Sequence, residues 1–209
     1  MTEISTIPAD GTKLPLVEDF YSIQGEGFHT GRAAFFIRLG GCDVGCSWCD
    51  SRFAWDPGLH PMIETDEIIT RVLISGTDSV VITGGEPLMW NLGYLSAQLK
   101  YKNIRTFIET SGAYPLSGEW DWICLSPKKN IPPVGNIWEK ADELKVIIEE
   151  KNDFDWAETY RKKVNPECRL FLQPEWSRFE SIIPEIVDYV RKNSCWRISL
   201  QVHKYMHIP

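Results

Sequence analysis

Short apolar runs alternate with helical patterns along most of this chain, and this alternation restricts the fold more than any other feature of the sequence. The runs are rich in β-branched or aromatic residues and are bounded by Gly, Pro, Asn or Ser, which is typical of strands. Between them, apolar residues recur at the three- and four-residue spacing of a helix with one buried face. Such alternation predicts a mostly parallel sheet covered by helices. The predicted strands are 17–21, 34–39, 80–83, 106–109, 122–126, 143–148, 170–173 and 198–202, and the clearest predicted helices are 65–74, 91–102 and 179–192.

The chain length narrows this α/β fold further. With 209 residues the chain suits one domain, and it is short for a full eight-fold barrel of roughly 250 residues. We therefore expect a partial barrel or an open α/β sheet. We predict a single domain over 1–209 in which the polar residues 1–16 form a flexible N-terminal extension.

Composition and charge exclude several classes of protein. Hydrophobic residues make up 43% and charged residues 24%, which is ordinary for a globular protein and excludes a disordered chain, a collagen or a coiled coil. Lys and Arg number 22 against 29 Asp and Glu, with no basic block, so we expect no nucleic-acid partner. No signal-peptide pattern and no membrane-spanning apolar run is present, which predicts a soluble, cytoplasmic protein. The six Cys are therefore expected to be thiols or metal ligands rather than disulfides.

Unusual residues follow the predicted strands. Because parallel strands end at the same edge of a sheet, and chemistry in such folds gathers there, these residues are expected to lie close together. They are Cys42, Gly84 to Pro87, Ser111 and Gly112, Ser126 to Lys128, Gln173 and Pro174, and His203.

The strongest chemical signal is a loop that carries three thiols. Cys42, Cys46 and Cys49 are separated by three and then two residues and follow a Gly-Gly pair. Thiols at this spacing can converge on one centre, either a zinc ion with a fourth ligand or three irons of a [4Fe–4S] cluster. A structural zinc needs a fourth Cys or His, and neither His29 nor His60 forms a ligand-pair pattern with the loop. Three buried thiols without a metal are the remaining alternative.

This loop resembles the signature of the radical S-adenosylmethionine (SAM) superfamily. Trp48 stands before the last Cys, and Gly84-Gly85-Glu86-Pro87 follows an apolar strand, as in that superfamily. The resemblance implies a [4Fe–4S] cluster whose open iron binds SAM, and reductive cleavage of SAM to a 5′-deoxyadenosyl radical. It also implies an electron donor such as flavodoxin or ferredoxin.

Within that superfamily the chain looks like the 7-carboxy-7-deazaguanine synthases. The likeness rests on segments 21–27, 49–51, 125–128 and 201–209, together with Arg38. It implies a lyase that contracts the ring of 6-carboxy-5,6,7,8-tetrahydropterin, releases ammonia and yields 7-carboxy-7-deazaguanine for queuosine or other 7-deazapurines. It further implies Mg²⁺, a homodimer and an incomplete βα barrel.

The resemblance also assigns roles to residues. A Glu26 carboxylate suits the guanidine-like edge of a pterin, Arg38 suits a substrate carboxylate, and the Ser51 hydroxyl suits Mg²⁺. The implied metal ligands are Cys42, Cys46 and Cys49 for the cluster and Ser51 for Mg²⁺; the implied SAM contacts are Trp48, Cys49, Asp50, Gly85, Glu86, Glu109, Ser126, Pro127, Lys128, Gln173 and Pro174; and the implied substrate contacts are Ile23, Gln24, Gly25, Glu26, Arg38, Thr83, His203 and Pro209.

Structural roles stand beside several of these assignments. Arg38 also suits a surface ion pair, Asp50 an Asx turn, Thr83 a half-buried strand and His203 a structural contact. Two other functions remain open. A glycyl-radical activase would use the same Cys loop with a protein substrate, and a non-catalytic module would use a metal only to hold the loop together.

Overall fold

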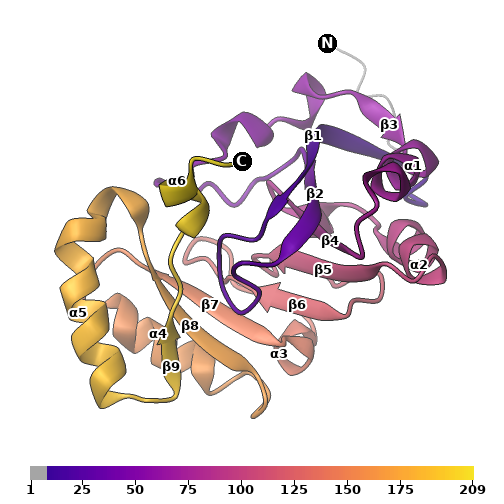
Figure 1. Cartoon of the computed structure of the whole chain (residues 1–209). Helices are drawn as coiled ribbons and strands as arrows, with labels where there is room; N and C mark the ends of the chain where they lie inside the picture. Colours follow the sequence, from indigo (N-terminus) through magenta and orange to yellow (C-terminus); the bar gives the residue numbers. More distant parts are fainter. Residues whose placement is uncertain (1–8) are drawn as a thin grey trace.

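The computed structural model describes residues 9–209 and shows one curved sheet with helices against its outer face (Figure 1). Within these residues the strands follow the order β3-β1-β2-β4-β5-β6-β7-β8-β9. β1 is antiparallel to both of its neighbours, whereas each pair from β2 to β9 is parallel. The sheet does not close, so the predicted incomplete βα barrel is confirmed. The strands are β1 (Lys13–Ile23), β2 (Ala33–Leu39), β3 (Met62–Glu64), β4 (Ser79–Gly84), β5 (Arg105–Thr110), β6 (Trp122–Leu125), β7 (Glu143–Ile148), β8 (Arg169–Pro174) and β9 (Trp196–Ile198).

Five of the helices pack outside the sheet, and a sixth crosses its open side near the C-terminus (Figure 1). In α5, Ile182 and Ile186 are buried against the sheet, as the helical spacing predicted. In the described part of the chain, no helix has the length and apolar character needed to cross a membrane. The α-helices are α1 (Thr65–Ser75), α2 (Gly93–Tyr101), α3 (Ile137–Lys140), α4 (Asp153–Arg161), α5 (Phe179–Lys192) and α6 (Val202–Met206), and the 3₁₀ turns are η1 (Arg52–Ala54), η2 (Pro57–Leu59), η3 (Pro87–Met89) and η4 (Trp176–Arg178).

The two faces of the sheet carry different side chains because successive residues of a strand point in opposite directions. In β7, Leu144 and Val146 lie in the large core under the helices. Their neighbours Glu143 and Lys145 alternate with them and are therefore on the inner, concave face. This alternation puts polar groups inside the barrel without exposing the apolar core.

Two predictions about the chain ends need correction. Residues 13–16, expected in a flexible extension, begin β1: residues 13–15 pair with β3, Leu16 pairs with β2, and Leu14 and Leu16 are buried. The rest of that extension up to residue 8 lies outside the described residues. The last predicted strand, 198–202, ends at Ile198, and Val202 instead begins α6 with its N–H donating to the Gly25 carbonyl (2.9 Å). Apolar alternation favoured a strand here, but a tertiary contact redirects the chain.

Candidate active site

A cavity of about 450 Å³ lies at the carboxyl ends of the parallel strands. Of the residues to which the sequence assigned a contact with metal, SAM or substrate, only Pro127 is not on its wall, and of the other residues expected at the strand ends, Pro87 and Gly112 also lie off it. The structure thus brings together side chains from the whole length of the chain, as the strand-end argument predicted. Those on the wall are Ile23, Gln24, Gly25, Glu26, Arg38, Cys42, Cys46, Trp48, Cys49, Asp50, Ser51, Thr83, Gly85, Glu86, Glu109, Ser126, Lys128, Gln173, Pro174, His203 and Pro209.

The cysteine loop is held against the cavity by hydrogen bonds at both flanks. Cys42 N–H donates to the Trp55 carbonyl (3.0 Å), and Asn130 Nδ2 donates to two carbonyls within the loop. Trp55 Nε1 donates to the Cys49 sulfur at 3.3 Å. Cys42, Cys46 and Cys49 are all half-buried. Three thiols therefore line one cavity on a loop that the rest of the protein fixes in place.

The donor set fits an iron–sulfur cluster. Among residues 9–209, no three His, Cys, Asp or Glu side chains are gathered closely enough for a single metal ion. A cluster differs from a single ion because several irons and sulfides stand between its thiolates. Burial raises the pKa of Cys42 and Cys46, so both are thiols in the absence of metal, and binding of iron would release their protons to solvent as the thiolates form. An N–H donor to a cysteine sulfur, as from Trp55, is a typical means of tuning such clusters.

The Gly84 to Pro87 segment packs directly against this loop. A Cβ on Gly85 would stand 2.3 Å from the Gly41 carbonyl oxygen, so only glycine permits the approach. Glu86 is almost fully buried, and its Oε2 accepts from Ser111 N (2.7 Å) and Ser111 Oγ (2.5 Å). Its Oε1 accepts from Thr110 Oγ1 (2.5 Å) and Leu88 N (3.0 Å). Glu86 therefore ties the end of β4 to the end of β5.

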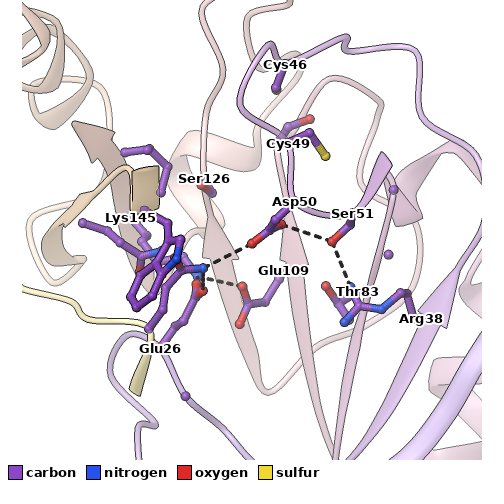
Figure 2. Close-up of a pocket in the computed structure, with 18 of the residues that line it drawn as sticks. Glu26, Arg38, Cys46, Cys49, Asp50, Ser51, Thr83, Glu109, Ser126 and Lys145 are labelled. Atoms are coloured by element: carbon purple, nitrogen blue, oxygen red, sulfur yellow. Dashed lines mark hydrogen bonds and ion pairs between the residues drawn. The ribbon is translucent and has the colours of Figure 1, made fainter. Parts of the chain in front are cut away.

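On one side of the cavity, a buried lysine joins two carboxylates. Lys145 is 3% exposed, and its Nζ donates to Glu26 Oε2 (2.5 Å) and Glu109 Oε2 (2.7 Å) (Figure 2). Gln24 Nε2 donates to the other oxygen of Glu109 (2.7 Å), and Gln201 Nε2 to the other oxygen of Glu26 (2.8 Å). All four carboxylate oxygens thus have a donor, which fixes both side chains.

Electrostatics in this network favour the charged forms. Burial alone would raise the pKa of Glu26, but the adjacent Lys145 ammonium outweighs it and holds this pKa well below its usual range. Burial alone would lower the pKa of Lys145, but the Glu109 and Glu26 carboxylates hold it above its usual value. The ammonium and the Glu26 carboxylate are therefore both charged at neutral pH.

Across the cavity, a chain of contacts links the cysteine loop to the C-terminal helix (Figure 2). Arg38 Nη1 donates to Ser51 Oγ (3.4 Å), and Ser51 Oγ donates to Asp50 Oδ1 (3.2 Å). Asp50 Oδ2 pairs with Lys204 Nζ at 3.1 Å. Arg38 Nε also pairs with Glu18 at 2.7 Å. Arg38 therefore makes the ion pair expected of a purely structural residue, and it also lines the cavity.

Lys128 lies deeper in the cavity. Its Nζ donates to Ser126 Oγ (2.7 Å) and stands 5.8 Å from the ring centroid of Trp48. Burial lowers the pKa of Lys128, and the Lys128 charge offsets part of the effect of burial, which raises the pKa of Cys46. Lys128 thus supplies positive charge beside the thiols.

The C-terminal segment forms part of the cavity wall. His203 packs on Gly25, and burial lowers the pKa of this imidazole. The Pro209 carbonyl oxygen accepts from Ser22 Oγ (3.1 Å). The last residues therefore contact the β1 end that carries Gln24 and Glu26.

Several residues of the cavity were missed in the sequence. Lys145 lay inside a segment interpreted as an apolar strand, although its alternation with Leu144 and Val146 would have placed it on the inner face. Gln201 and Lys204 carried no local signal because their partners lie on distant segments. The other unpredicted wall residues are Phe20, Phe36, Val44, Trp55, Val81, Thr110, Ile147, Glu175, Trp176 and Ser177, whereas Gly84 and Ser111 were expected at this edge without an assigned contact.

Comparison with known proteins places this site in a family. The profile of the Radical SAM superfamily matches residues 36–125. A 7-carboxy-7-deazaguanine synthase from Flavobacterium psychrophilum is 55% identical over 207 residues, which cover 99% of this chain and 98% of that protein. The chain belongs to the 7-carboxy-7-deazaguanine synthase family. A member of this family from Synechocystis sp. is 48% identical and covers 93% of both chains.

The fold agrees with this 7-carboxy-7-deazaguanine synthase family. The crystal structure of QueE from Escherichia coli superposes with a TM-score of 0.79 at 27% identity, covering 90% of this chain and 93% of that one. The resemblance inferred from the sequence is confirmed, and neither the activase nor the non-catalytic module is favoured. As a radical SAM enzyme, the chain belongs to a superfamily whose cofactors are a [4Fe–4S] cluster and SAM.

Proposed function

We propose that this enzyme contracts the ring of 6-carboxy-5,6,7,8-tetrahydropterin to 7-carboxy-7-deazaguanine with loss of ammonia, as a carbon–nitrogen lyase. The observation that carries the proposal is that one cavity joins the three thiols to Glu26, Arg38 and the C-terminal residues. A relative named 7-carboxy-7-deazaguanine synthase matches 99% of this chain at 55% identity.

The cofactors fit the residues present. Cys42, Cys46 and Cys49 would hold the [4Fe–4S] cluster, which with SAM supplies a 5′-deoxyadenosyl radical when reduced. For SAM itself, Glu109 is a fixed acceptor for hydroxyl groups, and Lys128 a buried cation. The other proposed contacts, at Trp48, Asp50, Gly85, Glu86, Ser126, Pro127, Gln173 and Pro174, follow the resemblance.

The substrate contacts follow from charge and hydrogen-bond complementarity. Glu26 is ionised, so it accepts from the amino and N–H groups of a pterin edge. Arg38 has five donors, of which Glu18 and Ser51 engage two, and the others suit a substrate carboxylate. Ile23, Gln24, Gly25, Thr83, His203 and Pro209 complete the proposed substrate surface.

The proposed Mg²⁺ ion, electron donor and homodimer are inferred from the resemblance to the family. Ser51 offers a hydroxyl beside the Asp50 carboxylate, a pair of oxygens that suits Mg²⁺, which takes few protein ligands. We infer that a protein such as flavodoxin or ferredoxin supplies the electron, and that two copies form a homodimer.

An anaerobic turnover assay tests the function. Protein with a reconstituted cluster receives 6-carboxy-5,6,7,8-tetrahydropterin, SAM, Mg²⁺ and a strong reductant, and mass spectrometry follows the products. We expect 7-carboxy-7-deazaguanine and ammonia, with SAM regenerated rather than consumed in proportion. SAM cleavage without this product would disprove the assigned substrate while leaving the cysteine loop intact as a radical SAM site.

A further inference from the structure

A third carboxyl group lies beneath the two that Lys145 joins. Glu143 precedes Lys145 by two residues on the same inner face of β7 and is 2% exposed. Its Oε2 accepts from Phe28 N (3.1 Å) and Trp122 Nε1 (3.1 Å). Its Oε1 has no hydrogen-bond partner among residues 9–209. One oxygen with two donors and another with none is the asymmetry of a neutral carboxylic acid, not of a carboxylate.

A second, small cavity adjoins this carboxyl group. It measures about 10 Å³, and its wall includes Glu143, His29, Glu26 and Glu109. His29 Nε2 is also buried without a partner in the described chain. Space for about one water molecule beside two unsatisfied polar atoms is the usual setting of a buried structural water.

The charge balance of this region leaves room for one proton. Glu26, Glu109 and Glu143 surround one ammonium, and Lys145 Nζ makes direct hydrogen bonds only to Glu26 and Glu109. Glu143 is buried and Glu26 and Glu109 are partly buried, so three carboxylates against one cation would leave a charge that this region solvates poorly. The group with no cation in direct contact is therefore the one that stays neutral.

The groups that face Glu143 are consistent with a neutral Glu143 beside ionised Glu26 and Glu109. Burial raises the pKa of Glu143 to about 7; the Lys145 ammonium opposes this shift, and the Glu109 carboxylate on β5 adds to it by a smaller amount. The thiols of Cys124 on β6 and Cys168 before β8 are themselves held neutral, mainly by burial. Burial also lowers the pKa of His29, so this ring brings no compensating positive charge.

We propose that Lys145 is a positioning residue that keeps Glu26 and Glu109 ionised while Glu143 carries the single proton of this carboxylate cluster and donates it in a hydrogen bond to a water in the small cavity. The inference deepens the proposed function. If Glu26 held the proton instead, it would present a donor to the donor edge of the pterin, and binding would weaken.

Infrared spectroscopy of the holoenzyme tests where the proton resides. We expect the carbonyl band of one protonated carboxyl group at about pH 6, shifted by ¹³C-glutamate labelling, titrating with a midpoint near pH 7 and absent from Glu143→Gln. A Glu143→Gln variant that retains the band, or a wild type without it, would overturn the assignment. This measurement needs no turnover, so it is independent of whether the assigned substrate is correct.

The role of Lys145 is tested through substrate affinity and its pH dependence. We expect Lys145→Met to raise KM for the pterin about tenfold at neutral pH, with a smaller change in kcat, because Glu26 and Glu109 then share a proton. The KM should fall again as pH rises. Lys145→Met combined with Glu109→Gln restores the charge count and should lose this pH dependence.

Lys151→Met removes an exposed lysine and serves as the control for loss of a positive charge. An unchanged KM and pH profile in Lys145→Met would overturn the positioning role, as would a pH-independent loss confined to kcat. If Lys145→Met does not fold, the infrared band of the wild type and its absence from Glu143→Gln still decide the proton assignment. If the wild type does not turn over this pterin, the proposed function fails, whereas the proton assignment stands or falls on the band alone.

Discussion

At the scale of single residues, the chemistry of this site rests on groups whose surroundings differ from water. Cys42 and Cys46 are half-buried thiols whose pKa values are raised by burial, and Lys128 is a buried cation beside them. Glu86 lies on the cavity wall, but its carboxylate accepts hydrogen bonds from Thr110, Ser111 and Leu88. The same residue types thus serve as binding groups or as structural ties, depending on which donors reach them.

Replacement of one cluster thiol separates cofactor binding from folding. We expect Cys46→Ala to lose iron, sulfide and visible absorption, together with all SAM cleavage, because two thiolates cannot hold the cluster in place. The chain should remain folded because this side chain is only half-buried. Metal analysis and absorption spectra provide the measurement. Cys195→Ala is the control, since Cys195 is exposed, and retained turnover in Cys46→Ala would disprove the ligand assignment.

The buried Glu143 gives stability an unusual pH dependence. Its pKa is raised from 4.5 to about 7 by burial, so the folded state holds a proton that the unfolded chain releases. Stability should therefore fall as pH rises from about 4.5 to about 7, by about 3 kcal/mol, and stay lower above this range. Glu143→Gln should abolish this loss. Urea unfolding at about pH 5 and pH 8 measures it, and equal pH slopes for both proteins would contradict the explanation.

At the scale of elements, the period of two in the strands decides what faces the cavity. In β2 and β4, Arg38 and Thr83 are paired in register, and their inward direction follows from the apolar residues that alternate with them. Helix α6 closes the same side of the barrel through contacts with the end of β1. The shape of the site therefore depends on how closely α6 approaches the segment that follows β1.

A methyl group between these elements should disturb the substrate side selectively. A Cβ on Gly25 would stand 2.2 Å from His203 Nδ1 and 2.7 Å from His203 Cβ, so Gly25→Ala must displace α6. We expect KM for the pterin to rise about tenfold or more, with a smaller effect on SAM affinity. Gly58→Ala is the control because Gly58 is exposed and its only close neighbour is the flexible Asp56 carboxylate. Unchanged pterin affinity would show that α6 does not shape the substrate site.

At the scale of the whole molecule, one continuous sheet carries all of the site. The large apolar cluster under the helices includes residues from β1 to β9, and a smaller cluster of Ala34, Phe36, Val81 and Phe107 lies on strands β2, β4 and β5 of the same sheet. The cavity draws on both halves of that sheet, and contacts such as that between Asp50 and Lys204 span its open side. Site and core are therefore expected to form and unfold together.

This continuity predicts one cooperative unfolding transition for the predicted single domain. Calorimetric and van't Hoff enthalpies should agree, and unfolding followed by fluorescence and by circular dichroism should coincide. Saturating SAM should shift the midpoint upward without broadening it, because the ligand binds only the folded state. Two separable transitions, of which SAM shifted only one, would contradict a single domain.

The fold class and most of the site could be predicted because the relevant signals are local. The three thiols fall within eight residues, short apolar runs mark every strand except β3, and parallel strands bring their ends to one edge wherever they lie in the chain. The sequence, with the family resemblance it carries, thus determined the incomplete barrel and the radical SAM signature, and nearly every site residue that it assigned lies on the cavity wall.

Only the tertiary structure decided how those residues are paired. Lys145 meets Glu26 across 119 positions of sequence, and Lys204 meets Asp50 across 154. The segment after Ile198 has the alternation of a strand but turns into α6, where Val202 bonds to Gly25. Such pairs form only where the fold brings their polar atoms within about 3 Å of each other, and the spacing of residues along the sequence does not predict that distance.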